Sequence, residues 1–393
     1  MEESTAYSLL SGWLGVKLKI QKKIKVNLHR RILVMNVGIV SIVDYENMGN
    51  RLQNYALQVT LLKYVDDVYT IRNKQARSNG IKDRMRNSAL ADKVWLNNLL
   101  KREKRAQLLS FSNKHIKSNP KCYWYNRECT ELEGKDQFDV YCAGSDQVWN
   151  PDGDRTGMFN FLGFADREQT FSYAASFGVD EIPEEHKAAV RKGLQHIKYI
   201  SVREDAGKRI VEELTGRTDV EVLVDPTMLL TTQEWDKILR APKAKVPEKY
   251  ILTYFLGPVS PERRKAIQDK ATKMGCTLIE VMDKNSPFYA IGPDQFVYLI
   301  KHAQLVCTDS FHGSVFSFLY QRRLAVFDRD GSGSNMGSRI DTFASKFHLE
   351  SCRVKGNALP EEIPQPDYSQ GYQALVLERE KSKRFLDKVF HKE

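Results

Sequence analysis

Short apolar runs alternate with helical patterns along most of this chain. From Met35 onward, the apolar runs are separated by segments in which apolar residues recur every three or four positions. Such alternation favours parallel strands joined by helices. The first example is a strand expected over residues 37–43, followed by a helix that opens near Gly49. One face of that helix carries Leu52, Tyr55, Ala56, Val59 and Leu62.

The same pattern repeats through both halves of the chain. Further strands are expected over residues 68–71, 138–143, 170–175, 199–202 and 220–224, and then over 250–256, 277–281, 304–308 and 324–327, the last strand. Helical patterns cover residues 77–118, 184–197, 204–215, 293–302, 315–320 and 373–391. The pattern therefore predicts the α/β class, with two Rossmann-like domains that each contain a parallel sheet.

A stretch with two prolines and no apolar periodicity, residues 239–248, separates the two halves. A length of 393 residues suits two hydrophobic cores. The expected division is a basic N-terminal extension (1–34), an N-terminal Rossmann-like domain (35–240), a C-terminal one (241–370) and a C-terminal helix (371–393).

The N-terminal extension is basic and lacks the continuous apolar stretch of a secretory signal. A misassigned start codon would explain it. A basic amphipathic contact with a membrane surface is the alternative, which would make the protein peripheral at the inner face of the membrane.

Charge and composition narrow the classes of partner. The formal net charge of +10 suits anionic partners, although a surplus of surface lysine would give the same value. The positive charge is spread along the chain, without zinc-finger spacing or an aromatic-rich single-strand module, so nucleic acid is not expected as a partner. The six cysteines include no C-x-x-C pair, and Cys142 and Cys307 are expected in the core. This usage, and the absence of any run of 18 apolar residues, predict a cytoplasmic protein.

Polar residues that directly follow predicted strands are the candidates for chemistry, because parallel sheets bind ligands beyond the carboxyl ends of their strands. The strongest set is Thr308-Asp-Ser-Phe-His-Gly-Ser314, between a strand and an apolar helix. A helix N-terminus offers free N–H groups to a phosphate or carboxylate. Gly313 permits close approach of a ligand, and His312 can move a proton near neutral pH. The alternative is a capped helix start with a histidine bonded to its own structure.

Two further loops have the same position relative to a strand. In the first, Asn47 and Asn50 are either ligand contacts or helix caps, and Gly49 permits an unusual backbone conformation. In the second, Ser145 and Asp146 follow a strand, and Trp149 either stacks on a ligand or packs in the core. Asp225, after the strand at 220–224, is expected to cap the next element.

Two arginines are candidates for an anion site. Arg203 follows the strand at 199–202 and could form bidentate contacts, although surface ion pairs with Glu204 and Asp205 are the alternative. Arg339 follows the glycine-serine loop Asn335-Met-Gly-Ser338. The candidate substrate-binding set is Asn47, Asn50, Ser145, Asp146, Arg203, Ser310, Gly313 and Arg339, with His312 as the catalytic candidate.

No motif for a metal or a bound cofactor is present. The chain contains no Walker A, G-x-S-x-G, H-E-x-x-H or G-x-G-x-x-G pattern. We therefore expect neither a protein-held metal nor a cofactor.

Six motifs occur in a fixed order between about residues 35 and 350. They are Asn47-x-Gly-Asn-Arg-Leu-Gln-Asn-Tyr-Ala-Leu-Gln58, Gly144-Ser-Asp-Gln-Val-Trp-Asn150, Phe171-Ser-Tyr-Ala-Ala-Ser176, Ser201-Val-Arg-Glu204, Val224-Asp-Pro-Thr227 and Asp309-Ser-Phe-His-Gly313. Together they resemble the polysaccharide pyruvyl transferase family.

The resemblance implies a GT-B-like fold with the active site in the cleft between the domains, the acceptor on the N-terminal side and the donor on the C-terminal side. It also implies transfer of the enolpyruvyl group of phosphoenolpyruvate onto sugar hydroxyls of a capsule, exopolysaccharide or cell-wall precursor, which gives a pyruvate ketal and phosphate. The acceptor would be a nucleotide- or lipid-linked sugar. By the same resemblance, His312 would be catalytic and Arg203 would hold phosphoenolpyruvate.

One position departs from the family pattern. Many members carry an arginine two residues before the histidine, and here Ser310 stands at that position. Asp309 adds a negative charge that would oppose a bound phosphate. The helix N-terminus, Arg203 and Arg339 are then expected to compensate.

Two other functions fit the same sequence. A GT-B glycosyltransferase that uses a nucleotide sugar would share the architecture, and nucleotide release would distinguish it. A non-catalytic binding module on a degenerate transferase scaffold would bind phosphoenolpyruvate without forming product.

Overall fold

The structure, a computed structural model, describes residues 35–42, 47–74, 95–125, 132, 137–153, 155–329, 338–363 and 365–391. Within it, Asn36–Glu393 form one compact unit. Several parts considered above lie outside the described residues: the extension 1–34, residues 43–46 of the first loop, residues 77–94, Cys129, and residues 335–337 before Arg339.

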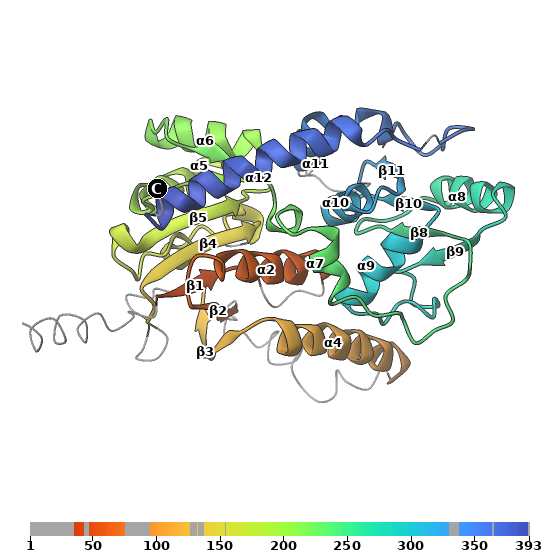
Figure 1. Ribbon diagram of the computed structural model, residues 1–393, viewed down its shortest axis with the longest axis horizontal. Helices are drawn as coiled ribbons and strands as arrows, with labels where there is room; N and C mark the ends of the chain where they lie inside the picture. The colour runs from red at the N-terminus through yellow and green to blue at the C-terminus, as the bar shows by residue number, and fades with distance from the viewer. Residues whose placement is uncertain are drawn as a thin grey trace, which may run out of the picture. The chain divides into compact units, whose positions relative to one another are not determined.

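Seven parallel strands form the first sheet, in the order β3-β2-β1-β4-β5-β6-β7. Figure 1 labels β1 to β5 of this sheet. In chain order they are β1 (Asn36–Val40), β2 (Asp67–Lys74), β3 (Ser118–Trp124), β4 (Val140–Asp146), β5 (Thr170–Ala175), β6 (Ser201–Val202) and β7 (Glu221–Val222). Because β1 lies between β2 and β4, the direction in which strands are added reverses there. Such a switch point is where doubly wound sheets bind ligands.

Five parallel strands form the second sheet, in the order β12-β11-β10-β8-β9. They are β8 (Tyr250–Tyr254), β9 (Thr277–Glu280), β10 (Leu305–Thr308), β11 (Arg323–Phe327) and β12 (Arg353–Val354). The switch point of this sheet lies between β8 and β10. The expectation that 324–327 is the last strand is wrong, because the two-residue β12 pairs with β11 at the edge and is too short to show a pattern.

Helices connect the strands of both sheets. They are α2 (Met48–Leu61), α4 (Trp95–His115), α5 (Glu184–His196), α6 (Asp205–Thr215), α7 (Thr232–Asp236), α8 (Pro261–Lys273), α9 (Pro293–His302), α10 (Phe311–Leu319), α11 (Ser338–Lys346) and α12 (Ser369–Val389). Single 3-10 turns lie at Pro151–Gly153, Met158–Phe161, Arg167–Gln169, Pro226–Met228 and Glu350–Cys352.

Besides β12, four elements were not expected from the pattern, namely β3, α7, α8 and α11. The helix pattern at 77–118 ends earlier than expected, at His115, and β3 follows it at the edge of the first sheet. Pro120 is tolerated there because an edge strand leaves some N–H groups unpaired, and the polar composition of β3 hides it. Helix α8 is similarly polar, and two of its four buried residues are Arg263 and Lys270.

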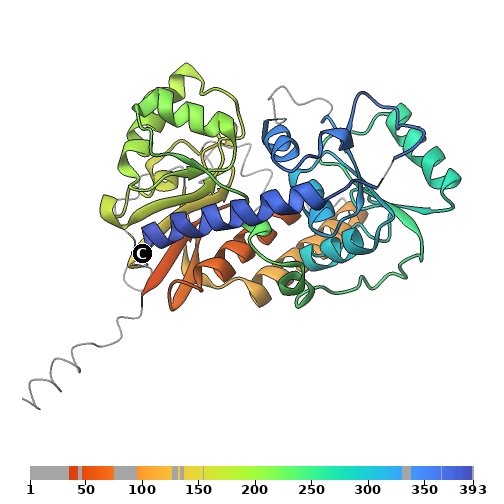
Figure 2. The same cartoon turned by 45° about the horizontal axis from the view of Figure 1, so that its top comes forward.

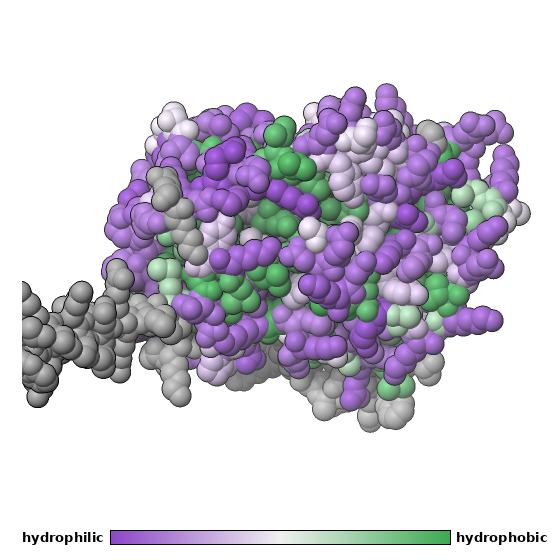
Figure 3. Space-filling view, viewed as in Figure 1, coloured by the Kyte–Doolittle hydropathy of each residue, from purple (hydrophilic) through white to green (hydrophobic). Residues whose placement is uncertain are grey.

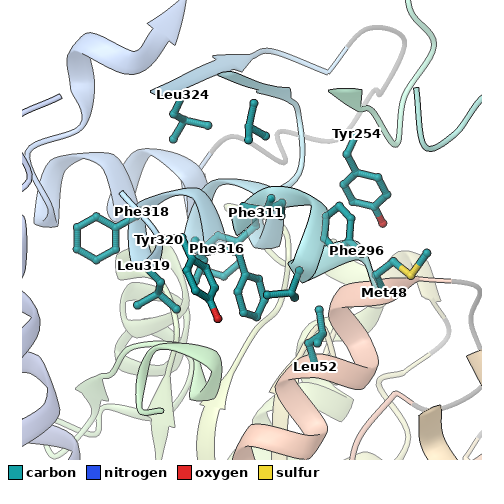
Figure 4. Close-up of a cluster of buried hydrophobic side chains, with 14 of the residues drawn as sticks. Met48, Leu52, Tyr254, Phe296, Phe311, Phe316, Phe318, Leu319, Tyr320 and Leu324 are labelled. Carbon is teal, nitrogen blue, oxygen red and sulfur yellow. The ribbon is translucent and has the colours of Figure 1, made fainter. Parts of the chain in front are cut away.

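A shared hydrophobic core joins α2 to the helices of the second sheet. Met48 and Leu52 of α2 belong to the same buried cluster as Phe296 of α9 and Phe316 of α10. Figure 4 shows these side chains pointing toward one another across the contact. Trp235 completes the contact, with its ring 4.9 Å from that of Phe316. This apolar packing fixes the start of α2 against the start of α10.

Helix α12 packs against both halves of the chain (Figure 2). Leu375, near its N-terminus, lies in the cluster around α10, whereas Leu386 and Phe390 lie in the cluster beneath β1 and β5. Between them, Arg379 donates hydrogen bonds to the carbonyls of Met228 and Leu230. The C-terminal helix is therefore part of the core.

Cys142 and Cys307 are fully buried, as expected. No helix in the described part of the chain is long and apolar enough to cross a bilayer. Polar residues cover most of the face in Figure 3, and apolar surface gathers in its central part, where α12 crosses. The exposed large apolar residues of α12 are Val376 and Leu377.

Replacing Leu386 with alanine should lower the free energy of unfolding by about 2–5 kcal/mol, because the side chain is 1% exposed and its loss leaves a cavity under the first sheet. Leu377→Ala, on the same helix but 70% exposed, should change it by less than about 0.5 kcal/mol. Urea unfolding measures both values. Equal effects of the two substitutions would contradict the placement of α12 in the core.

Candidate functional site

The two switch points face one cavity of about 390 Å³. Residues that follow β1 and β4 line one side, and residues that follow β8 and β10 line the other. The lining residues are Ile42, Asn47, Asn50, Asp146, Gln147, Asn150, Arg155, Leu256, Ser310, Phe311, His312, Arg329 and Arg339. The carboxyl ends of both sheets thus contribute polar groups to a single space, as doubly wound topology favours.

His312 lies in the first turn of α10, directly after the carboxyl end of β10. Ser310 caps this helix, with its Oγ accepting a hydrogen bond from the Gly313 N–H at 3.4 Å. The imidazole is 5% exposed and reaches the start of α2, where a Cβ built on Gly49 would lie 2.0 Å from Nδ1. Gly49 therefore makes room for the catalytic candidate. It sits inside helix α2 and has no left-handed backbone, so the sequence-based interpretation of its role is wrong.

A buried carboxylate lies on the other side of the imidazole. Nε2 of His312 is 3.7 Å from Oδ2 of Asp225, beyond hydrogen-bond length but close enough for attraction once the ring is protonated. Asp225 caps the turn that follows it, as expected, by accepting hydrogen bonds from the N–H and hydroxyl of Thr227. Its approach to His312 was missed, because a cap and a partner of a distant histidine look identical in sequence.

Arg203 is the second partner of Asp225. Its Nη1 donates a hydrogen bond to Oδ2 of Asp225 at 2.7 Å, and it also meets Asp146 at 3.4 Å and Glu204 at 4.0 Å. The guanidinium is buried, so these are not the surface pairs considered from the sequence, and Asp205 instead accepts a hydrogen bond from Thr342. Arg203 is not among the residues that line the cavity.

The charged groups around Asp225 and Arg203 shift one another's pKa values. Burial opposes ionisation of Asp225, but His312, Arg203 and Thr227 outweigh it and hold the pKa of this carboxyl well below its ordinary value. Burial likewise opposes the charge of Arg203, and the carboxylates of Asp225, Asp146 and Glu204 outweigh it and raise the pKa of the guanidinium. Both groups are therefore charged at neutral pH, and Asp225 offers a permanent negative charge to His312.

Three arginines line the cavity itself. Arg155 stacks on the Tyr125 ring at 4.0 Å, Arg329 follows β11, and Arg339 lies at the start of α11. Burial, reinforced by repulsion from Arg203, lowers the pKa of Arg339 to about 10. The cavity is thus an environment of positive charge. Sequence reasoning identified Arg339 and missed Arg155 and Arg329, which no motif singles out.

Asp309 does not oppose an anion in the way the sequence suggested. Its Oδ1 accepts a hydrogen bond from the Leu256 N–H at 2.7 Å, and its Oδ2 accepts from the Gly257 N–H at 2.9 Å and from Arg329 Nε at 3.2 Å. The carboxylate is therefore matched by donors from the loop after β8 and by an arginine, and it joins the two sides of the second switch point.

Side-chain amides line the first-sheet side of the cavity. Asn47 caps α2 by accepting from the Gly49 N–H, and Asn150 accepts from the Asp152 N–H. The amide nitrogens of both, and the whole amide of Asn50, which is 5% exposed, have no hydrogen-bond partner among the described residues. These groups can bind the hydroxyls of a ligand.

The remaining candidates support the site from behind. Ser145 is fully buried, and its hydroxyl bonds to the Ala174 carbonyl and approaches Asp225. At Gly313, an added Cβ would lie 2.7 Å from Thr308 Oγ1, so this glycine lets α10 pack on β10. Trp149 is fully buried and stacked on Phe161, which confirms the core interpretation. Neither Ser145 nor Gly313 lines the cavity.

No group of three metal-ligating side chains is found in the described ranges of the chain.

Replacing Asp225 with asparagine should destabilise the protein by about 3–5 kcal/mol at pH 7, because the buried Arg203 loses its nearest counter-charge. Because the pKa of Asp225 is lowered in the folded protein, its contribution to the free energy of unfolding is complete above about pH 4. That contribution is lost as the pH falls toward the pKa of Asp225 in the folded protein. The free energies of unfolding of the parent protein and Asp225→Asn, measured in urea, should therefore differ less and less below about pH 4. Asp205→Asn, next to Arg203 in sequence but unpaired with it, is the control. A difference that stays constant in acid would contradict the role of Asp225.

The chain resembles several solved structures. UDP-N-acetylglucosamine 2-epimerase from Rickettsia bellii matches with a TM-score of 0.50 and 10% identity, over 91% of this chain and 97% of the epimerase. Arabidopsis thaliana UGT89C1 complexed with UDP-L-rhamnose matches with a TM-score of 0.45 and 11% identity, over 90% and 98% of the two chains. The glycosyltransferase SnogD from Streptomyces nogalater gives a TM-score of 0.35 and 8% identity, over 90% and 96%. The two parallel sheets and the match to the epimerase show a fold of the GT-B kind, and an identity this low shows the fold alone.

No curated protein sequence matches the chain significantly. The family model "Polysaccharide pyruvyl transferase" matches residues 47–331, which include all six motifs and every residue that lines the cavity except Ile42 and Arg339. The chain belongs to the polysaccharide pyruvyl transferase family.

Proposed function

We propose that this transferase moves the enolpyruvyl group of phosphoenolpyruvate onto two hydroxyls of a sugar, giving a pyruvate ketal and inorganic phosphate. The observation that carries the proposal is the position of His312, between Asp225 and a cavity lined by three arginines, in a chain of this family. A proton carrier beside a cationic cavity suits a small donor that bears a phosphate and a carboxylate.

The chemistry requires three proton transfers, one to the methylene carbon and one from each of two sugar hydroxyls, and no electron transfer. A proton adds to the methylene carbon of the enol phosphate, which becomes a methyl group and leaves positive charge on the carbon that bears the phosphate. A sugar hydroxyl attacks that carbon and loses its proton, and the bond to phosphate breaks. A second hydroxyl then closes the ketal, and its proton leaves with the phosphate. The balance needs no cofactor, and none is proposed.

His312 is the proposed acid and base. Its ring faces the cavity on one side and the ionised Asp225 on the other, so the carboxylate stabilises the imidazolium that would deliver the proton. A general acid or base in this position typically contributes roughly 10²- to 10⁴-fold to the rate. The cavity arginines would hold the donor and stabilise the charge that develops on the departing phosphate.

The acceptor would bind on the amide side of the cavity. Asn47, Asn50 and Asn150 present uncharged donors and acceptors, which suit the hydroxyls of a neutral sugar better than they suit an anion. The proposed acceptor is therefore a sugar of a polysaccharide precursor, carried on a nucleotide or a lipid. Ser310, Asp146 and Arg339 complete the residues proposed to contact substrates.

The test is a release assay with phosphoenolpyruvate and a panel of nucleotide-linked and lipid-linked sugars. Acceptor-dependent phosphate release with formation of a ketal would support the proposal. Nucleotide release without phosphoenolpyruvate would identify a glycosyltransferase instead. Saturable binding of phosphoenolpyruvate without product, across the whole panel, would identify a binding module.

Replacing His312 with alanine should lower kcat by roughly 10²- to 10⁴-fold, because the proton carrier is removed. The thermal unfolding midpoint should stay close to that of the parent protein, which separates loss of chemistry from loss of fold. Steady-state phosphate release measures the effect. Unchanged turnover in a folded variant would remove His312 from the mechanism.

Replacing Gly49 with alanine should displace the His312 ring, since the new methyl group would overlap Nδ1. A displacement of about 1 Å at a reacting group can lower kcat by roughly 10²-fold. Gly207→Ala on α6, where the nearest atom to a new Cβ lies at 3.3 Å, is the matched control and should retain activity. Equal turnover of the two variants would show that the approach of α2 to His312 does not matter.

A further inference from the structure

The guanidinium of Arg203 is already paired with carboxylates of the protein itself. Three carboxylates surround its guanidinium, at 2.7 Å from Asp225, 3.4 Å from Asp146 and 4.0 Å from Glu204, and the side chain is 2% exposed. A donor anion would have to displace one of these carboxylates to reach it. The cavity, in contrast, is lined by other arginines, so the contact with the donor is better sought among them.

Arg329 lies on the second-sheet wall of the cavity, together with Ser310 and His312. Its side chain is 18% exposed and is fixed along one edge: Nε donates to Oδ2 of Asp309 at 3.2 Å, and Nη2 donates to the Asp309 carbonyl at 3.4 Å. Asp309 is itself 1% exposed and held by two backbone N–H groups. The guanidinium therefore has a rigid support.

The chain makes room for this side chain. A Cβ built on Gly257 would lie 2.5 Å from Cγ of Arg329, so a larger residue at 257 would push the arginine away. Gly257 also supplies one of the N–H groups that hold Asp309. The loop after β8 thus both accommodates the arginine and orients its counter-ion.

Two of the five N–H donors of Arg329 are used by Asp309. Among the described residues, Nη1 has no hydrogen-bond acceptor, so the edge formed by Nη1 and Nη2 retains donors for a ligand. A guanidinium edge of this kind matches two oxygens of a phosphate or carboxylate in a bidentate contact. Ser310, in contrast, uses its hydroxyl to cap α10, which an arginine side chain cannot do because it has no acceptor.

We propose that Arg329, supported by Asp309 and accommodated by Gly257, forms a bidentate contact with the anionic donor, and so supplies the cation that position 310 lacks. The inference rests on the proposed function, since it names a residue that holds the donor of that reaction. Arg339 lines the same cavity, and its lowered pKa reflects burial and the repulsion of nearby guanidinium groups. A bound anion would relieve that repulsion.

The experiment is isothermal titration calorimetry of the full chain with phosphoenolpyruvate. Arg329→Ala should raise the Kd by roughly 10- to 100-fold, the effect expected for loss of a charge-assisted bidentate contact. Arg167→Ala, at a half-exposed arginine whose partners are Glu168 and a backbone carbonyl, is the matched control and should leave the Kd unchanged. If the parent protein and the control bind phosphoenolpyruvate and Arg329→Ala binds it equally well, the inference is overturned.

A second variant is needed in case Arg329→Ala destabilises the segment that carries Arg329. Arg329→Gln retains a donor for Asp309 but removes the charge and the fork, and it should weaken phosphoenolpyruvate binding to a similar degree, with an unfolding midpoint close to that of the parent. Unchanged affinity in this variant would also overturn the inference. Absence of binding to the parent protein itself would instead contradict the proposed function, so the two failures are distinguishable.

Discussion

The buried carboxylate of Asp225 is the interaction on which the rest of the site depends. It follows the last strand of the first sheet, yet it accepts a hydrogen bond from Arg203 and lies 3.7 Å from a histidine at the carboxyl end of the second sheet. Burying an ionised carboxylate costs free energy unless charged or polar partners surround it. Here those partners include Arg203 and His312. Arg203 keeps the carboxylate charged, and that charge faces the imidazole of His312. The arginine expected to hold the donor is thus the partner of the carboxylate beside the imidazole.

Packing places these groups within reach of one another. The cluster that joins α2 to α9 and α10 brings the start of α2 against His312 so closely that only glycine fits at position 49. The two sides of the cavity carry different side chains, because each side is built from residues at the end of a different sheet. Amides from the segments after β1 and β4 line one side, together with Asp146 and Arg155, whereas the second side carries His312, Arg329 and Arg339. This arrangement suits the proposed pair of substrates, with the sugar acceptor on the amide side and the anionic donor beside the imidazole.

Much of the fold follows from the apolar pattern, because both sheets are parallel and their strands are buried on both faces. Where the burial is partial, the pattern fails: β3 is an edge strand with polar residues and a proline, and α8 buries little apolar surface. The loops that follow strands were correctly identified as the source of the cavity, since that depends on topology alone. Partners were harder to predict. Asp225 reaches the site through its approach to His312, which lies 87 positions later in the sequence. Arg329 does so through its hydrogen bond to Asp309, which lies 20 positions earlier. Such tertiary contacts leave no pattern in the sequence.

The fate of the central carbon of phosphoenolpyruvate tests the proposed activity most directly. With donor labelled by carbon-13 at that carbon and an acceptor that supports phosphate release, nuclear magnetic resonance of the product should show a saturated carbon bonded to two sugar oxygens, which only ketal formation gives. Label recovered solely as free pyruvate, or left in unreacted phosphoenolpyruvate for every acceptor, would contradict the proposed transfer.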